Sequence, residues 1–239
     1  MKRRRVRQSG FTLIEVLIVL LLMSIIMGAI FTQISTAQKR STAEQAKLDL
    51  FQEAREFMDQ LTRDLRNAGY PNRRNYGPGV SPTDSTNAVG LTHIGNADVW
   101  FEGDVEGGGT VSVVKYHYEP NGENCPCLQR SEVMKSAGTA DNYSVEVQHL
   151  QNGTADNPIF EYYDTTGAQI APSSLPLDNT TTLGRQKLAS VAVIKINMSV
   201  QARYADLQTG IRPIVTLVST AHLENCSQAV SSQGNSCQQ

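Results

Sequence analysis

An acidic side chain lies inside a long apolar segment near the start of the chain. The segment runs from Phe11 to Phe31, and Glu15 is the single charged residue among its 21 positions. A carboxylate in an apolar membrane helix costs about 2.5–3.5 kcal/mol on insertion scales, so it needs a partner of opposite charge. Cleavage between Gly10 and Phe11 would create an α-amine that could neutralise the Glu15 carboxylate of an adjacent copy. The spacing predicts processing after Gly10 and side-by-side assembly through apolar helices.

Positive charge is concentrated before this segment. The first ten residues hold five bases and no acid: Lys2, Arg3, Arg4, Arg5 and Arg7. The whole chain has 21 Lys+Arg and 23 Asp+Glu, so without these five bases 16 remain against 23 acids, a net charge of −7. An acidic remainder argues against a nucleic-acid-binding domain, because it repels phosphate. Positive flanking charge stays cytoplasmic, so residues after about 37 should lie outside the cytoplasm.

One continuous helix is expected over residues 11–68, on the order of 87 Å long. Residues 11–31 span roughly 30 Å, enough to cross a bilayer and longer than the apolar core of a signal peptide. Residues 32–68 form an amphipathic second half, with Asp64 on the solvated face. Gly69 and Pro71 supply the C-terminal stop. The apolar stripe of this half comprises Leu48, Phe51, Met58, Leu61, Leu65 and Ala68, widened by Leu50, Ala54 and Phe57.

The rest of the chain reads as a variable loop over 69–96, a β-rich domain over 97–224 and a cysteine-pinned tail over 225–239. Strands are expected at 97–102, 110–119, 128–131, 143–150, 159–164, 188–204 and 211–223, separated by turn signals at hairpin-like spacing. Within 188–204, alternate residues are apolar and should be buried: Ile194, Ile196, Met198, Val200, Ala202 and Tyr204. The fold class is therefore α+β, with a long N-terminal helix packed on a mostly antiparallel sheet.

The short basic leader ending in Gly10, followed by FTLIEVLIVLLLMSII, resembles the type III signal of type IV pilins and type II secretion pseudopilins. The resemblance implies a pilin-like fold, cleavage after Gly10 by a membrane-embedded prepilin peptidase, and methylation of the new amine of Phe11. It also implies that Glu15 pairs with a neighbour's N-terminus. The protein would first cross the inner membrane once, with its N-terminus inside, and then reach the pilus or cell surface.

Two further segments are similar to W-type minor pilins and their J-type pseudopilin relatives. These are EAREFMDQLTRDLRNAGYP at 53–71 and YYD before a glycine turn at 162–167. No proline follows the apolar run around Gly28, a departure from major pilins that fits a minor subunit. The resemblance implies a minor pilin that primes a type IV pilus at its tip. Implied partners are other minor pilins, the major pilin, the peptidase, the inner-membrane assembly platform and membrane lipid. A J-type pseudopilin and a DNA-uptake pilin are the alternatives.

The cysteines lie in the part placed outside the cytoplasm, where disulfides persist. They are Cys125, Cys127, Cys226 and Cys237. Pairing Cys226 with Cys237 would leave Cys125 and Cys127 to close a very small ring. Pairing each cysteine of the Cys-Pro-Cys segment with one of the tail is preferred, because it closes much longer loops. A four-cysteine metal site is the third reading, but the spacing does not suit it.

No enzyme, metal site or cofactor emerges from the other residues that could do chemistry. The histidines, at 93, 117, 149 and 222, occur singly, and an anchored enzyme would need them to gather with carboxylates. The acidic run 103–109 lacks the ligand pattern of a calcium loop and reads as a hairpin turn. Arg73 and Arg74 beside Tyr70 and Tyr76 form a small basic and aromatic patch that gives weak support for DNA binding.

Overall fold

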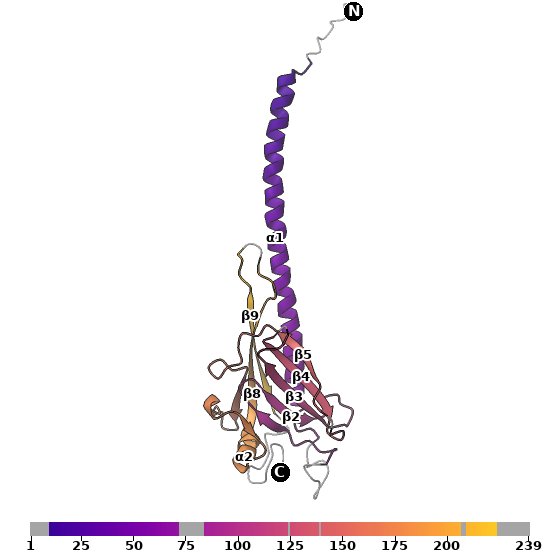
Figure 1. Cartoon of the computed structure of the whole chain (residues 1–239), viewed down its shortest axis with the longest axis vertical. Helices are drawn as coiled ribbons and strands as arrows, with labels where there is room; N and C mark the ends of the chain where they lie inside the picture. The colour runs from indigo at the N-terminus through magenta and orange to yellow at the C-terminus, as the bar shows by residue number, and fades with distance from the viewer. Residues whose placement is uncertain (1–9, 72–83, 124, 139, 207–208, 224–239) are drawn as a thin grey trace, which may run out of the picture.

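A single helix dominates the computed structural model, which describes residues 10–71, 84–123, 125–138, 140–206 and 209–223. Helix α1, Leu13–Arg66, is uninterrupted over 54 residues and therefore about 81 Å long. Figure 1 shows its first half standing free and its second half packed against a β-rich domain. The prediction of one continuous helix is confirmed, with each end two residues shorter than expected. Asn67 caps the helix, and Gly69 follows at φ 81°, a left-handed conformation that suits glycine.

The domain covers less of α1 than the apolar stripe predicted. Burial begins at Ala54 and continues through Phe57, Met58, Leu61 and Leu65. Leu48 and Phe51 were expected to be buried, but their exposed fractions are 58 % and 39 %. The prediction was wrong for these two residues because the domain covers only one side of α1 at their level, the side on which Leu50 packs against the core. A stretch of α1 between the apolar run and the domain therefore presents apolar side chains to solvent.

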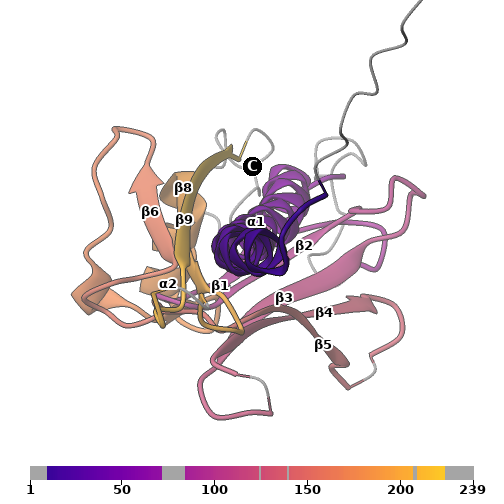
Figure 2. The ribbon, with the colours of Figure 1, turned by 90° about the horizontal axis from the view of Figure 1, so that it is seen from above.

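Two antiparallel sheets form the domain. The larger has the order β5-β4-β3-β2-β1-β7 and the smaller the order β6-β8-β9. Viewed along α1, the helix lies between the two sheets (Figure 2). The strands are β1 Leu91–Ile94, β2 Val99–Gly103, β3 Ser112–Glu119, β4 Cys127–Met134, β5 Tyr143–Gln148, β6 Phe160–Asp164, β7 Leu177–Asp178, β8 Val191–Gln201 and β9 Ile214–His222.

Seven of these strands overlap expected strand segments, although β2 and β4 extend beyond the expected bounds, and the remaining elements were missed. Strand β1 lies inside the expected loop 69–96, and β7 follows a short 3₁₀ helix at Pro172–Ser174. Helix α2, Thr182–Ser190, takes the first three residues of the strand expected at 188–204. Its N-cap Thr181 accepts a hydrogen bond from the backbone N–H of Gly184, so a cap signal was present before the strand pattern.

Alternation along β8 was predicted correctly except at its end. Ile194, Ile196, Met198 and Val200 are buried, as is Ala202 just beyond the strand. Tyr204 was expected on the same face, but 74 % of it is exposed. Strand β8 ends at Gln201, and the β8–β9 connection projects along α1 beyond the sheet (Figure 1). Tyr204 therefore lies where no core exists to bury it.

Gly103 marks the closest approach of α1's end to the larger sheet. A Cβ atom at this position would collide with the backbone carbonyl of Asn67. We expect Gly103→Ala to lower the free energy of unfolding by about 1–3 kcal/mol, because backbone must shift to admit the methyl group. Urea unfolding of the full chain in detergent, followed by Trp100 fluorescence, measures the loss. Gly108→Ala is the control: its Cβ meets nothing within 4 Å, so a loss as large as that at Gly103 would contradict the argument.

Candidate processing and assembly site

The predicted cleavage point lies just before α1 begins. Gly10, Phe11 and Thr12 precede the first helical residue, and 87 % of Phe11 is exposed. A Cβ at Gly10 would meet nothing within 4 Å, and the residue is not left-handed. The chain's own fold therefore does not require glycine at this position. An accessible, non-helical peptide bond is what a peptidase needs. The leader charges at residues 2, 3, 4, 5 and 7 lie outside the described residues.

Glu15 has a local partner that the sequence reading missed. Its Oε2 accepts hydrogen bonds from the backbone N–H of Thr12 at 2.9 Å and from the Thr12 hydroxyl at 3.0 Å. In return, the backbone N–H of Glu15 donates to the Thr12 hydroxyl oxygen at 3.4 Å. This is a capping box, and the signal for it was the Thr-x-x-Glu spacing at 12–15. The carboxylate is therefore oriented toward the N-terminal end of the helix, where a neighbour's amine would have to approach.

The apolar side chains that follow this cap have no contact with the domain. Residues 13–31 are all exposed, and α1 is long and apolar enough to cross a membrane. Nearly all its large side chains from Leu13 to Ile34 would face water if the chain were free in solution. Lipid or other apolar helices must cover them, because exposed apolar surface of this extent is unfavourable. The capping box of Thr12 and Glu15 therefore lies at the start of a helical segment that is stable only in apolar surroundings.

One comparison with known families matches the start of the chain. Residues 5–31 match the prokaryotic N-terminal methylation motif. The match spans the expected cleavage point after Gly10, Glu15 and the apolar run. It supports a type IV pilin or pseudopilin, which is a structural subunit anchored in a membrane with its domain outside. No curated protein and no solved structure matches the chain.

A buried ion network fixes α1 of this pilin-like chain to the larger sheet. The Asp64 carboxylate accepts hydrogen bonds from the Tyr116 hydroxyl at 2.6 Å and from Arg130 Nε at 3.0 Å. Arg130 also donates to Glu132 at 2.6 Å. Asp64 was placed on the solvated face of the helix, which was wrong. Its position three residues after Leu61 and four before Ala68 lies on the apolar stripe, and this spacing was the available signal.

Burial governs the ionisation of this network. It raises the pKa of Asp64 above its ordinary value, and the opposing effects of the Tyr116 hydrogen bond and the Arg130 charge do not cancel the rise. Burial and the neighbouring carboxylate also raise the pKa of Tyr116 well above its ordinary value. The ionised form of Asp64 is therefore stable only with its partners Tyr116 and Arg130, because an unpaired buried carboxylate is unfavourable.

The two segments that resemble W-type minor pilins have structural roles in this fold. Residues 53–66 are the part of α1 that enters the domain. The hydroxyl of the fully buried Tyr162 donates to the carbonyl oxygens of Gly95 and Asp98, at 2.9 and 3.1 Å, which ties β6 to the β1–β2 turn. Asp164 Oδ1 accepts backbone N–H groups from Thr166 and Ala168 in the following turn. The Tyr162 contacts therefore link the two sheets, whereas those of Asp164 stabilise the turn after β6.

The structure pairs the cysteines differently from the preferred prediction. Cys125 is bonded to Cys127 across Pro126. The Cα atoms of the two cysteines lie 4.3 Å apart, so the chain turns sharply enough for the sulfurs to meet. A link from each of them to the tail is therefore excluded while this bond is present. Cys226, Cys237 and the rest of the tail lie outside the described residues.

The remaining candidate sites form no reaction centre in the described part of the chain. His93 stacks on Trp100, and His117 lies 2.7 Å from Asp98. His149 follows the end of β5, and His222 lies at the end of β9. No three His, Cys, Asp or Glu side chains among the described residues gather to hold a metal ion. The 103–109 run is a hairpin turn in which Asp104 accepts the N–H groups of Gly108 and Gly109. Arg73, Arg74 and Tyr76 of the DNA patch lie outside the described residues, and Tyr70 is exposed.

Proposed function

We propose that the chain is a minor pilin that takes part in starting a type IV pilus, after cleavage behind Gly10 and methylation of Phe11. The observation that carries the proposal is the orientation of Glu15. Its carboxylate lies at the exposed start of an apolar helix, directed toward the end of the chain that cleavage would create. In an assembling filament, the methylated amine of an adjacent subunit supplies the missing positive charge.

The two halves of α1 have different roles in this proposal. The apolar half of α1 moves from the bilayer into the filament core, where other apolar helices replace lipid. The network around Asp64 holds the domain at a fixed height on α1, so the position of the helix sets the position of the domain. The absence of proline within Leu13–Arg66 keeps the helix continuous through this region, as suits a minor rather than a shaft subunit.

Deletion of the gene in the producing bacterium tests the proposal. We expect at least a tenfold loss of surface pili, with recovery when the intact gene is returned, because initiation limits the number of filaments. Pilus counts by electron microscopy and surface motility measure the effect. Unchanged piliation and motility would refute a role in initiation.

A J-type pseudopilin of a type II secretion system is the second candidate, because the methylation motif supports pilins and pseudopilins alike. The same deletion separates the two. A pseudopilin predicts that secreted enzymes accumulate inside the cell while surface pili stay normal. A minor pilin predicts loss of pili with normal secretion.

A further inference from the structure

Strand β9 forms one edge of the smaller sheet, and half of its backbone groups point away from that sheet. Leu223 N–H donates to the carbonyl of Ala192, and Ala202 N–H donates to that of Pro213, so the odd-numbered residues of β9 are those bonded to β8. The residues between them direct their N–H and C=O groups outward: Ile214, Thr216, Val218, Thr220 and His222. They are exposed, and these outward groups have no hydrogen-bond partner in the described part of the chain.

The other sheet edges of the domain are short, charged or covered. Strand β7 has two residues, and β5 carries Glu146 within its six. The segment after β6 returns along it, with Ile170 N–H donating to the carbonyl of Tyr162 at 2.8 Å. Strand β9 has nine residues without Lys, Arg, Asp, Glu or Pro. Natural proteins protect edge strands by these devices, so an unprotected edge of this length is a site for pairing with another strand.

Apolar side chains lie on both sides of this free edge. On the outer face of the sheet, Ile214 and Val218 are 55 % and 60 % exposed. On the inner face lies α1, where the Thr62 hydroxyl is 3.0 Å from the hydroxyl of Ser219. The path along β9 from Ser219 back to Ile214 covers about 16 Å, which equals the rise of about eleven helical residues. The start of β9 therefore lies at the level of Phe51 on α1.

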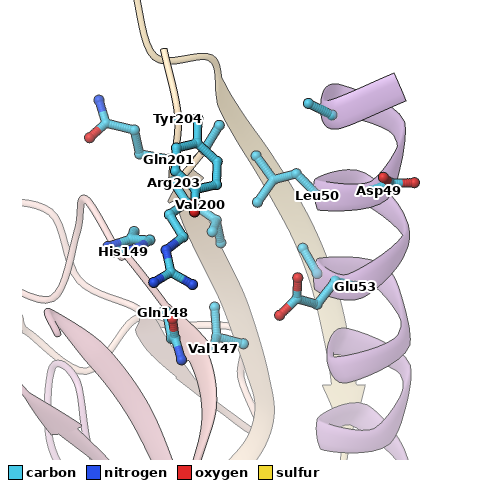
Figure 3. A pocket seen from close by; sticks show the side chains of 13 residues that line it. Asp49, Leu50, Glu53, Val147, Gln148, His149, Val200, Gln201, Arg203 and Tyr204 are labelled. Atoms are coloured by element: carbon cyan, nitrogen blue, oxygen red, sulfur yellow. The ribbon is translucent and has the colours of Figure 1, made fainter. Parts of the chain in front are cut away.

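Leu48 and Phe51 lie on the side of α1 that faces β9. They precede Thr62 by about four and three whole turns of helix, which places all three on one side. Leu50 instead points into a cleft between α1 and the ends of β5 and β8 (Figure 3). The domain therefore has side chains of its own opposite Leu50, whereas Leu48 and Phe51 remain exposed beside the start of β9.

We propose that the free edge of β9 binds an extended segment of another pilin subunit as an added antiparallel strand. Main-chain hydrogen bonds supply affinity in such a contact, and alternate side chains supply specificity. One face of the added strand lies against Leu48 and Phe51, and the other lies beside Ile214 and Val218. The segment that fits is therefore apolar on both faces and uncharged. The inference rests on the proposed function for the kind of partner, a different subunit of the complex that starts the filament.

The direction of β9 favours a different subunit over a second copy of this chain. Strand β9 begins at the β8–β9 connection, which lies toward the free half of α1, so β9 and α1 run in the same direction (Figure 1). Two copies held in one membrane have parallel helices, and their β9 strands can pair only in the parallel sense. Parallel pairing is slightly less stable per residue than antiparallel pairing. A subunit whose edge strand runs against its own helix supplies the antiparallel partner.

Site-specific photo-cross-linking in the producing bacterium tests the contact. Benzoylphenylalanine in place of Thr216 of the full chain is expected to join it, on irradiation, to a different protein with a methylated prepilin-type N-terminus. Peptide mapping should place the attachment in an uncharged, apolar segment of that protein. The same photo-reactive residue in place of Leu183, which is exposed on α2, is the control and should not capture it. Attachment to another copy, to residues 224–239 of the same chain, to a protein of another kind, or to nothing would overturn the inference.

Substitutions at Val218 separate main-chain pairing from side-chain contact in the same assay. The Val218 N–H points away from β8, so Val218→Pro removes an edge donor and leaves the bonds to β8 in place. It is expected to lower the yield of the adduct at least about tenfold, whereas Val218→Ala should lower it only about twofold. Val218→Lys keeps the donor but adds the charge by which natural edges are protected, so a loss of about fivefold is expected. Unchanged yields for the proline and lysine variants would contradict strand addition.

Two controls keep these results distinct from unfolding and from failed processing. Urea unfolding of the full chain in detergent, followed by Trp100 fluorescence, should give the same midpoint for all three variants. If proline lowers the midpoint, the lysine variant decides. The N-terminal peptide is read from the same digest as the adduct. A chain that begins at methylated Phe11 but gives no adduct overturns strand addition alone, whereas a chain that keeps its leader overturns the proposed function.

Discussion

Glu15→Val is expected to remove the chain from surface filaments while leaving it cleaved and inserted in the membrane. Valine lowers the cost of inserting the helix, since an acidic residue there costs about 2.5–3.5 kcal/mol. In the filament the substitution leaves the neighbour's amine buried without a counter-charge, which costs about 3–5 kcal/mol. The expected loss of incorporation is therefore about a hundredfold or more. The measurement is the fraction of the chain in sheared filaments relative to membranes.

Thr12→Ala separates the charge of Glu15 from its local hydrogen bonds. This change removes the capping partner but keeps the carboxylate, so it should cost only about 1 kcal/mol of helix stability and leave incorporation close to normal. If Glu15→Val enters filaments as well as the unaltered chain does, the carboxylate has no role in assembly. If Thr12→Ala is as severe as Glu15→Val, the role of Glu15 is to cap its own helix.

Asp64→Ala is the substitution expected to destabilise the domain most. It leaves the Arg130 guanidinium half-buried and takes away the hydrogen-bond acceptor of Tyr116. Glu132 still partners Arg130, so the expected loss is about 3 kcal/mol, the lower end of the range for a broken buried ion pair. Urea unfolding of the full chain in detergent measures it through Trp100. The domain should then also lose its fixed height on α1.

Two comparisons sharpen the Asp64 prediction. Asp59→Ala removes an exposed acid from the same helix and should change the free energy of unfolding by no more than about 0.5 kcal/mol. The double variant Asp64→Leu with Arg130→Met replaces the pair by apolar side chains and should recover most of the loss. Equal effects of Asp64→Ala and Asp59→Ala would show that the network does not hold the helix.

The membrane-proximal half of the fold was predictable because strong local signals agree there. An apolar run without proline that follows a basic segment predicts one continuous helix, and α1 is such a helix. Glu15 was singled out for its charge, yet its bond to Thr12 was missed, although the Thr-x-x-Glu spacing is a local signal. Gly69 and Pro71 predicted a stop after residue 68, and the helix ends two residues earlier, at Arg66.

Burial along the second half of α1 depends on contacts distant in sequence. Leu48 and Phe51 share the periodicity of Leu61 and Leu65, but only the latter pair lies on a part of α1 that the domain covers. Asp64 is polar yet buried, because Tyr116 and Arg130 from β3 and β4 lie opposite it. Tyr204 continues the alternation of β8 past the end of the sheet. In each case periodicity indicates a face of the element, while tertiary structure decides whether that face is covered.

The Cys125–Cys127 bond was not the preferred pairing, for a different physical reason. Loop length favoured cross-links to the tail, because longer loops remove more chain entropy from the unfolded state. The structure joins the two nearest cysteines instead, which the turn at Pro126 brings together. Local backbone geometry, which loop-length reasoning does not include, decided this pairing.

The mass of the N-terminal peptide of the mature protein tests the central claim most directly. The chain is purified from membranes and filaments of the producing bacterium, digested, and its first peptide sequenced by tandem mass spectrometry. The account predicts a peptide that begins at Phe11 and carries one methyl group on its α-amine, with no trace of the residues through Gly10. A mature protein that keeps its leader, or begins at any other residue, would contradict it.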